Sequence, residues 1–283
     1  MLSYRHGFHA GNFADVLKHL VQIAILQYLK KKATPFYYHD THAGSGSYNV
    51  SHPYMQKNRE YLGGITRIWE SKPVSPLLKE YLALVRQLNP TGELLCYPGS
   101  PEIAVRLLRH MDRAWFGEKH TTDFRILSTH YRKQPGVHCE MMDAWQGVKA
   151  KLPPKEHRGL ILIDPSYELE SDYRQLTRAL EDALQRFALG TYAIWYPVID
   201  ERTTDKLLRR FAALPVRDNL HIHLDLGKEK SEPGMHACGM FIINPPFTLA
   251  DTMKQTLPEL LSLLADNKKT GRFLIEKLKV ENG

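Results

Sequence analysis

Acidic side chains end four of the strands that the hydrophobic pattern of this 283-residue chain predicts. Asp40, Glu118 and Asp164 close predicted strands, and Asp143 directly follows another. Because ligands of open α/β sheets lie beyond the carboxyl ends of the strands, we expect these carboxylates to surround one site. Each carboxylate alone is equally well explained as the N-cap of the next helix. The four together favour a ligand with hydroxyl groups and positive charge over a bare phosphate.

The sequence of the loop after Asp40 indicates which nucleotide cofactor would bind at such a site. Residues 44–46, Gly-Ser-Gly, predict a tight turn where backbone approaches a ligand. The third glycine of the dinucleotide-binding motif is missing. S-adenosylmethionine carries no phosphate, but it has a sulfonium, an ammonium, a carboxylate and a ribose diol. We predict that Glu118 accepts hydrogen bonds from the ribose hydroxyls. The Asp40 region would then meet the ammonium, and Asp143 the adenine amine.

The tetrapeptide Asp164-Pro165-Ser166-Tyr167 resembles the (Asp/Asn/Ser)-Pro-Pro-(Tyr/Phe) motif of amino-group methyltransferases. The exocyclic amine of a base is a poor nucleophile, because its lone pair is delocalised into the ring. Hydrogen bonds to the Asp164 carboxylate and the Pro165 carbonyl would turn that lone pair toward the methyl group, so positioning carries most of the catalysis. Tyr167 would stack on the flipped base, a contact worth about 1–3 kcal/mol, and offset part of the unstacking cost. Ser166 replaces the second proline of the motif, and we expect the mechanism to survive this change.

A second segment, residues 244–247, Asn-Pro-Pro-Phe, fits the same motif more closely. It follows the last predicted strand, which in this fold lies away from the strand that ends in Asp40. The strand that ends in Asp164 lies beside that first strand, across the point where the strand order reverses. The expected topology therefore favours Asp164 as the functional residue, and we interpret residues 244–247 as a turn after a buried strand.

Strands and helices alternate along most of the chain, which predicts an α/β fold with a largely parallel sheet covered on both faces. With the cofactor inferred above, we predict a seven-stranded, Rossmann-like, S-adenosylmethionine-dependent methyltransferase fold. The predicted strands are residues 36–40, 114–118, 137–142, 159–164, 192–196, 220–226 and 238–243. The predicted helices are residues 12–32, 101–110 (with Ser100 as N-cap), 123–132, 173–187, 203–213 and a segment from 249 onward.

Residues 47–96 break this alternation, because their pattern is mostly helical and prolines interrupt it. We predict no strand in this segment. The predicted division is a methyltransferase catalytic domain of residues 1–46 and 97–283, with a helical insertion subdomain of residues 47–96.

The composition excludes several classes of protein. Hydrophobic residues make up 43% of the chain, too many for a disordered or collagen-like protein. No apolar run approaches the roughly 18 residues of a membrane helix, and the three cysteines are too far apart for a zinc motif or a disulfide framework. We predict a cytoplasmic monomer. The net charge of +7 suggests an anionic partner. Residues 1–34 contribute much of that charge, although Lys30–Lys32 also suit the end of a helix.

With these residues in view, the chain resembles the RlmJ family, bacterial methyltransferases that modify an adenine N6 in 23S ribosomal RNA. The segments that carry the resemblance are residues 1–6, 9–12, 14–19, 40–44, 97–101, 158–165 and 195–197. The resemblance implies that Asp164 is the catalytic residue and that the helical insertion is a family feature. It implies cofactor contacts at His19, His42, Ser100, Glu118, Asp143, Ala144 and Asp164, with Lys18 beside them. Ala144 replaces a glycine of the relatives, a change that a backbone contact tolerates. Tyr4 and His6 match an N-terminal tail that closes near the target base.

The sequence therefore predicts S-adenosylmethionine-dependent methylation of an adenine N6 in 23S ribosomal RNA. Two alternatives remain: adenine-N6 methylation of DNA, and a non-enzymatic nucleic-acid-binding protein used in the uptake of external DNA. The chain lacks a recognisable DNA-reading motif, which favours RNA. His39 and His42 have no accompanying His-Glu-x-x-His or cysteine pair, so we predict no metal.

Overall fold

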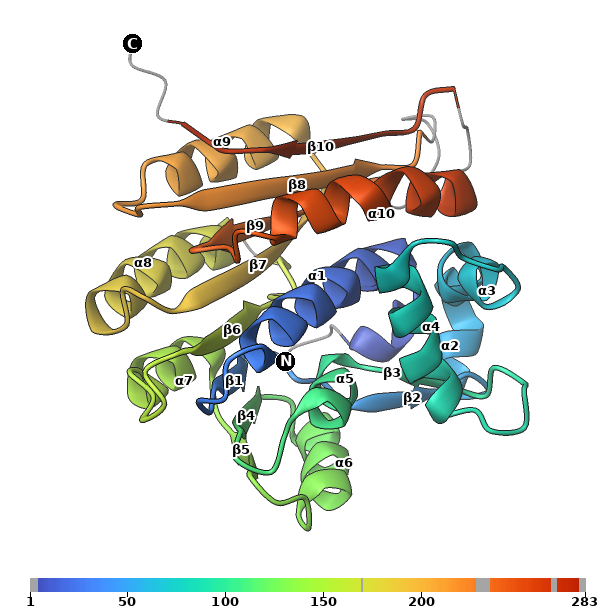
Figure 1. Ribbon diagram of the computed structural model, residues 1–283, viewed down its shortest axis with the longest axis horizontal. Helices are drawn as coiled ribbons and strands as arrows, with labels where there is room; N and C mark the ends of the chain where they lie inside the picture. Colours follow the sequence, from blue (N-terminus) through green and yellow to red (C-terminus); the bar gives the residue numbers. More distant parts are fainter. Residues whose placement is uncertain (1–4, 169, 228–234, 266–268, 280–283) are drawn as a thin grey trace.

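A mixed sheet forms the centre of the computed structural model, which describes residues 5–168, 170–227, 235–265 and 269–279 (Figure 1). The sheet has eight strands in the order β10-β8-β9-β7-β6-β1-β4-β5. Neighbours are parallel from β7 to β5, whereas β9 runs antiparallel to β7 and β8, and β10 runs antiparallel to β8. The strands are β1 (Tyr37–Asp40), β4 (Arg113–Glu118), β5 (Val137–Met141), β6 (Gly159–Ile163), β7 (Thr191–Val198), β8 (Asn219–Asp225), β9 (Ala237–Ile243) and β10 (Arg272–Glu276).

This arrangement confirms the predicted α/β class, and corrects the strand count from seven to eight. The eighth strand, β10, is an edge strand with alternately exposed residues. Its short pattern lies at the end of the chain, where the prediction gave only helix. The prediction also missed the helix that starts at Ala144, and it placed the start of another helix one residue late, because Gly99 and not Ser100 is the N-cap.

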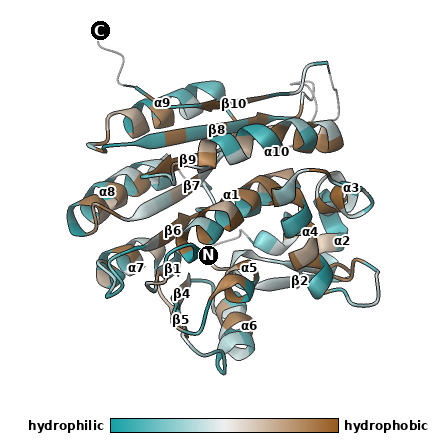
Figure 2. Ribbon diagram, in the orientation of Figure 1, coloured by the Kyte–Doolittle hydropathy of each residue, from teal (hydrophilic) through white to brown (hydrophobic). Residues whose placement is uncertain are grey.

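Helices cover both faces of the sheet, so its central strands are apolar on both sides. In β6, Leu160 and Leu162 pack into the core on one face, and Ile161 and Ile163 pack into the core on the other. The first face is covered by α1 (Phe13–Lys30), α5 (Ser100–Leu107), α6 (Thr121–Tyr131) and α10 (Leu249–Leu264). The second face is covered by α7 (Ala144–Lys151), α8 (Glu170–Arg186) and α9 (Glu201–Ala212). Figure 2 shows hydrophilic and hydrophobic residues alternating around the outer helices α8 and α9.

Helix α1 is buried along most of its length, between the sheet and the helices α4, α5 and α10. The side chain of Asn12 caps it by accepting a hydrogen bond from the backbone N–H of Asp15 (2.9 Å). Asp15, Lys18 and His19 are polar residues buried on this helix. Buried charges need partners, and the partners of Asp15 and Lys18 lie in the functional site described below.

The segment between β1 and α5 begins and ends in a small second sheet. β2 (Ser47–Asn49) pairs antiparallel with β3 (Cys96–Pro98), so the prediction of no strand in residues 47–96 is wrong at both ends. These strands have three residues each, too few to show a strand periodicity. Between them lie α2 (Pro53–Asn58), the 3₁₀ helix η2 (Glu60–Gly63), α3 (Ile65–Trp69) and α4 (Pro76–Gln87). Buried residues of α4 belong to the same hydrophobic core as α1. The division into domains stays a prediction.

Within the described part of the chain, every helix is too short or too polar to span a membrane.

Candidate active site

The carboxyl ends of β6, β1, β4 and β5 bring the predicted acidic residues to one edge of the sheet. Asp40 pairs with Leu162 of β6 and with Phe116 of β4 in the strand register. Asp164 and Glu118 each lie two residues beyond these partners, so these two carboxylates are level with each other and Asp40 lies two residues below them. Asp143 follows β5, the next strand along the sheet.

A cavity of about 270 Å³ opens at this edge. Its wall includes five of the residues that were predicted to bind the cofactor: His42, Glu118, Asp143, Ala144 and Asp164. The charged groups in the wall are mostly acidic. They are the carboxylates of Glu118, Asp123, Asp143, Asp164, Glu168 and Asp172 and the ammonium of Lys119. Such a wall favours a cationic ligand over a pyrophosphate.

Glu118 and Asp143 are held in place by backbone donors. Glu118 accepts hydrogen bonds from the N–H groups of Gly44 (2.8 Å) and His120 (2.6 Å), and burial raises its pKa. Asp143 caps α7 by accepting a hydrogen bond from the N–H of Trp145 (3.1 Å), so the N-cap role that was left open for this residue is present.

Three other predicted cofactor ligands lie behind this cavity and do not line it. Asp40 is buried and accepts hydrogen bonds from the Tyr38 hydroxyl (2.8 Å) and from the N–H of His42 (3.3 Å). Burial raises the pKa of Asp40, although hydrogen bonds, including one with Ser100, oppose that rise. His19 is fully buried, its Nδ1 lies 2.9 Å from the Tyr97 hydroxyl, and burial lowers its pKa to about 3. In this structure, Asp40, Ser100 and His19 support the loops and α1.

The glycine-rich loop is shaped by tyrosines as well as by its backbone. Gly44 and Gly46 have φ angles of +59° and +86°, in the left-handed region that favours glycine. A Cβ atom on Gly44 would collide with the Tyr48 hydroxyl, and one on Gly46 would lie 2.7 Å from the Tyr131 ring. The two glycines are therefore required by the conformation and by the packing of the loop itself.

A second cavity, of about 560 Å³, adjoins the first. His6, Asp164 and Ser166 line both cavities, so Asp164 lies where the two meet. Lys18, which was predicted to lie beside the cofactor ligands, lines the second cavity. We call the first the acidic cavity and the second the α1 cavity.

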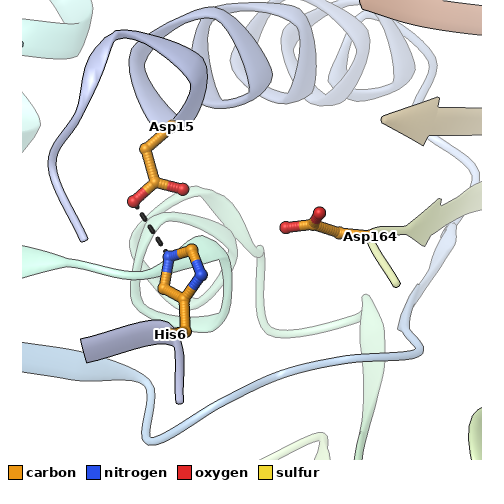
Figure 3. A group of neighbouring side chains, drawn as sticks. All are labelled: His6, Asp15 and Asp164. Carbon is orange, nitrogen blue, oxygen red and sulfur yellow. Dashed lines mark hydrogen bonds and ion pairs between the residues drawn. The ribbon is translucent and has the colours of Figure 1, made fainter. Parts of the chain in front are cut away.

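A network of charged side chains holds Asp164 at this junction. The Lys18 ammonium lies 2.5 Å from Oδ2 of Asp164 and 2.7 Å from Oδ1 of Asp15. Oδ2 of Asp15 in turn accepts a hydrogen bond from the N–H of Gly11 (2.9 Å) and lies 2.9 Å from Nε2 of His6. Figure 3 shows His6, Asp15 and Asp164 converging from three different segments of the chain.

Both Asp15 and Lys18 are almost fully buried, with 3% and 4% of their surface exposed. Burial alone would raise the pKa of Asp15, but the charges of His6 and Lys18 hold it well below its usual value. Burial alone would lower the pKa of Lys18, but Asp15 and Asp164 raise it well above its usual value. Lys18 therefore remains a charged donor that fixes the orientation of the Asp164 carboxylate.

The oxygen and nitrogen atoms of His6, Asp15 and Asp164 are close enough together to hold a metal ion. However, the ammonium of Lys18 contacts both carboxylates at 2.5 and 2.7 Å. A cation between the two carboxylates would have to displace this ammonium, which already contacts both of them.

Tyr167 lines neither cavity. Its φ angle is +52°, and only 5% of its surface is exposed. Its hydroxyl donates a hydrogen bond to the Trp195 carbonyl (2.6 Å), and its ring packs on Tyr173 and Trp195. Stacking of a base on Tyr167 would require the loop to rearrange, so this role stays a prediction. Pro165 lines the acidic cavity, and Tyr4 lies outside the described residues.

Sequence analysis missed several residues of the α1 cavity, among them Asp15, Arg59, Arg67 and Trp195. Asp15 carried a signal, because it lies one helical turn before Lys18 on a helix whose other residues are mostly apolar. Arg59 and Arg67 carried none, because surface arginines are common and their approach to the site depends on how residues 47–98 pack.

Three features together define a Rossmann-like methyltransferase. They are a doubly wound α/β sheet, an acidic cavity at its strand ends and an Asp-Pro-x-Tyr loop beside that cavity. Residues 33–277 match the family model described as "Ribosomal RNA large subunit methyltransferase D, RlmJ". The chain is 44% identical to the ribosomal RNA large subunit methyltransferase J of Haemophilus influenzae, over 98% of each chain. It is also 44% identical to the Escherichia coli protein of the same name, over 93% of this chain and 94% of that protein. A crystal structure of a Legionella pneumophila protein superposes with a TM-score of 0.88 at 36% identity, and the match covers 95% of this chain and 98% of that one.

The chain therefore belongs to the RlmJ family of ribosomal RNA large-subunit methyltransferases, which confirms the family predicted from the sequence.

Proposed function

We propose that this protein transfers a methyl group from S-adenosylmethionine to the N6 amine of an adenine in 23S ribosomal RNA. The observation that carries the proposal is the position of Asp164, where the acidic cavity and the α1 cavity meet. A donor in one cavity and a target base in the other would both reach this residue. The printed names of the two curated relatives support large-subunit ribosomal RNA as the substrate.

The acidic cavity fits the proposed cofactor. Six carboxylates and one lysine in its wall suit a ligand with a sulfonium and an ammonium and without phosphate. Glu118 would bind the ribose hydroxyls, and Asp143 and Ala144 would hold the adenine. The cofactor supplies an electrophilic methyl group when it is bound.

Asp164 and Pro165 would position the target amine. Because Lys18 binds Oδ2 of Asp164, we assign Oδ1 to accept one N6–H hydrogen bond, and the Pro165 carbonyl to accept the other. These bonds turn the nitrogen lone pair toward the methyl group. Methyl transfer to this nitrogen would leave S-adenosylhomocysteine, and the proton lost from the amine would pass to water. The contribution of the protein is mainly orientation, which needs no metal.

The test uses protein-free large-subunit RNA from a strain that lacks this gene. The RNA is incubated with the protein and isotope-labelled S-adenosylmethionine, and the modified nucleoside is identified by mass spectrometry. We expect labelled N6-methyladenosine at one position, formed far more slowly with Asp164→Ala. Duplex and single-stranded DNA are assayed in parallel, and a preference for DNA would overturn the RNA assignment.

A thermal-shift measurement separates an enzyme from a simple nucleic-acid-binding protein. S-adenosylhomocysteine at about 100 times its dissociation constant should add about 2.7 kcal/mol to the free energy of unfolding. An unchanged melting temperature, together with RNA binding, would support the binding protein and contradict the methyltransferase.

A further inference from the structure

The α1 cavity is larger than a purine base requires. Its volume of about 560 Å³ lies within the roughly 300–1,000 Å³ that hold a whole drug-sized ligand. Its wall includes Asp164 and Ser166 as well as Arg59, at the C-terminal end of α2, and Arg67 of α3. The cavity therefore joins the proposed catalytic residue to the segment between β2 and β3, and leaves room for more of a nucleotide than its base.

Arg59 holds an unusual backbone conformation in this wall. It ends α2 with φ +52° and ψ +31°, in the left-handed region where helix ends usually place glycine or asparagine. A non-glycine residue there costs of order 1–3 kcal/mol and is commonest where the side chain has a function. The side chain of Arg59 is exposed. Within the described part of the chain, its guanidinium contacts no carboxylate closely enough to form an ion pair.

The neighbouring carboxylate already has other partners. Oε1 of Glu60 lies 2.8 Å from Nδ1 of His9, and Oε2 accepts a hydrogen bond from the Asn12 side chain (2.9 Å). The hydrogen bond with Glu60 raises the pKa of His9, although burial opposes it. Glu60 thus ties this segment to the start of α1, while Arg59 lines the α1 cavity.

We propose that Arg59 binds a backbone phosphate of the RNA strand, next to the adenosine whose base reaches Asp164. This inference rests on the proposed function. A guanidinium donates two parallel hydrogen bonds to a phosphate, which fixes both distance and orientation. Phosphate contacts of this kind set the register of a strand without reading its bases. The segment between β2 and β3 would then hold the strand while the base reaches Asp164.

The test is the substitution Arg59→Gly, which removes the charge and relieves the backbone strain, so the variant should fold. Arg132→Gly is the matched control. Arg132 is also an exposed arginine at a helix C-cap, and it lines neither cavity. Each protein is titrated onto a fluorescein-labelled RNA hairpin with adenosines in its loop. Methylation kinetics are measured on protein-free 23S RNA.

For Arg59→Gly we expect Kd for the hairpin and KM for the RNA to rise about tenfold, the effect of losing one charge-assisted contact. The kcat and the KM for S-adenosylmethionine should stay within about twofold of the wild type, since Arg59 does not line the acidic cavity. The slope of log Kd against log salt should flatten by about 0.7–0.9. Arg59→Lys should restore the salt slope, and Arg132→Gly should change none of these values.

Equal RNA binding by Arg59→Gly and Arg132→Gly would overturn the phosphate contact. So would a loss confined to kcat with an unchanged salt slope. Failure of the proposed function is a separate outcome. A wild-type protein that binds the hairpin through Arg59 but methylates no RNA would support the contact and overturn the methyl transfer.

Discussion

Two tetrapeptides that resemble the same motif lie at opposite ends of the strands of the sheet. Residues 164–167, Asp-Pro-Ser-Tyr, follow β6, and residues 244–247, Asn-Pro-Pro-Phe, follow β9. β6 runs parallel to its neighbours, but β9 runs antiparallel to β7, so that Ile243 pairs with Tyr192 near the start of that strand. The first tetrapeptide therefore lies at the end of the sheet where β1, β4 and β5 also end. The second tetrapeptide lies at the opposite end, where these strands begin. Strand direction, more than agreement with the motif, decides which tetrapeptide can do chemistry.

The polar groups of the two segments also have different partners. Asp164 is paired with Lys18, which comes from a helix 146 residues away along the chain. The Asn244 amide donates two hydrogen bonds to backbone carbonyls of the turn before β7, those of Ala188 and Gly190 (2.8 Å each). Phe247 is 81% exposed and lies edge-on to Tyr28. One segment holds a charge beside two cavities, and the other closes a turn, as the sequence interpretation of residues 244–247 expected.

The largest effect should come from Asp164→Ala. Removing the acceptor that orients the amine should lower kcat for RNA methylation by about 10²–10³-fold, the usual cost of one positioned hydrogen bond in a transition state. Radiolabelled methyl transfer to 23S RNA measures this loss. The matched variant is Asn244→Ala, which should keep kcat within about twofold. Full activity in Asp164→Ala, with a loss in Asn244→Ala, would show that the other edge carries the site.

Asn244→Ala should instead affect stability. It removes both hydrogen bonds to the 188–190 turn, and alanine disfavours the φ angle of +50° found at this position. We expect the free energy of unfolding to fall by about 1–2 kcal/mol, as measured by urea denaturation. Asn244→Gly, which adopts this φ freely, separates the two causes. If glycine is as harmful as alanine, the hydrogen bonds account for the loss, and if glycine is harmless, the φ angle accounts for it. Unchanged stability in both variants would contradict the turn interpretation.

The edge that carries the site was predictable because local patterns specify it. The apolar run of β6 with Asp164 at its end, and the strands that end in Asp40 and Glu118, are visible in the sequence. The rule that ligands bind at the carboxyl edge of such sheets then places these residues together.

What could not be predicted depends on contacts between distant segments. The pairing of Ser47 with Pro98 joins two three-residue strands across the whole insertion. The contact of Lys18 with Asp164 requires the packing of α1 on the sheet to be known. The burial of Tyr167 against Trp195 follows from a positive φ angle that its residue type does not indicate. Each of these depends on tertiary packing, which local propensity does not encode.

The strands β9 and β1, which lead to the two ends of the sheet, also differ in how they affect stability at low pH. β9 contains only apolar residues, whereas β1 contains His39, which is fully buried against Trp115. Burial lowers the pKa of His39 from 6.5 to about 3. Below pH 6.5, His39 binds a proton in the unfolded chain but stays neutral in the folded protein. The contribution of this residue to stability is therefore fully present above pH 6.5. Its contribution is lost as the pH falls toward 3, by up to about 1.4 kcal/mol per pH unit.

His39→Phe should therefore flatten the loss of unfolding free energy between pH 6.5 and pH 4.5, measured by urea denaturation at several pH values. Asp40 and Glu118, whose pKa values are raised by burial, act in the opposite direction. The quantity to compare is therefore the slope of unfolding free energy against pH, in the variant and in the wild type. His138→Gln, on the exposed side of β5, is the control for the loss of a surface histidine. Equal slopes for all three proteins would show that His39 is protonated in the folded state.

The smallest effect is expected where the two tetrapeptides differ by a proline. Ser166 lines both cavities and stands where the motif, and residues 244–247, have proline. Proline restricts the unfolded chain, so Ser166→Pro should raise the free energy of unfolding by about 0.4–1 kcal/mol if the loop accepts its φ angle. Methyl transfer should be kept or raised, because the Asp164 carboxylate and the Pro165 carbonyl stay in place. Pro246→Ser, the reciprocal change at the other edge, should lower stability by a similar amount and leave methylation unchanged. Loss of methylation in a folded Ser166→Pro protein would mean that the loop works through the Ser166 side chain or through its freedom to move, and that the motif chemistry was assigned to the wrong features of this segment.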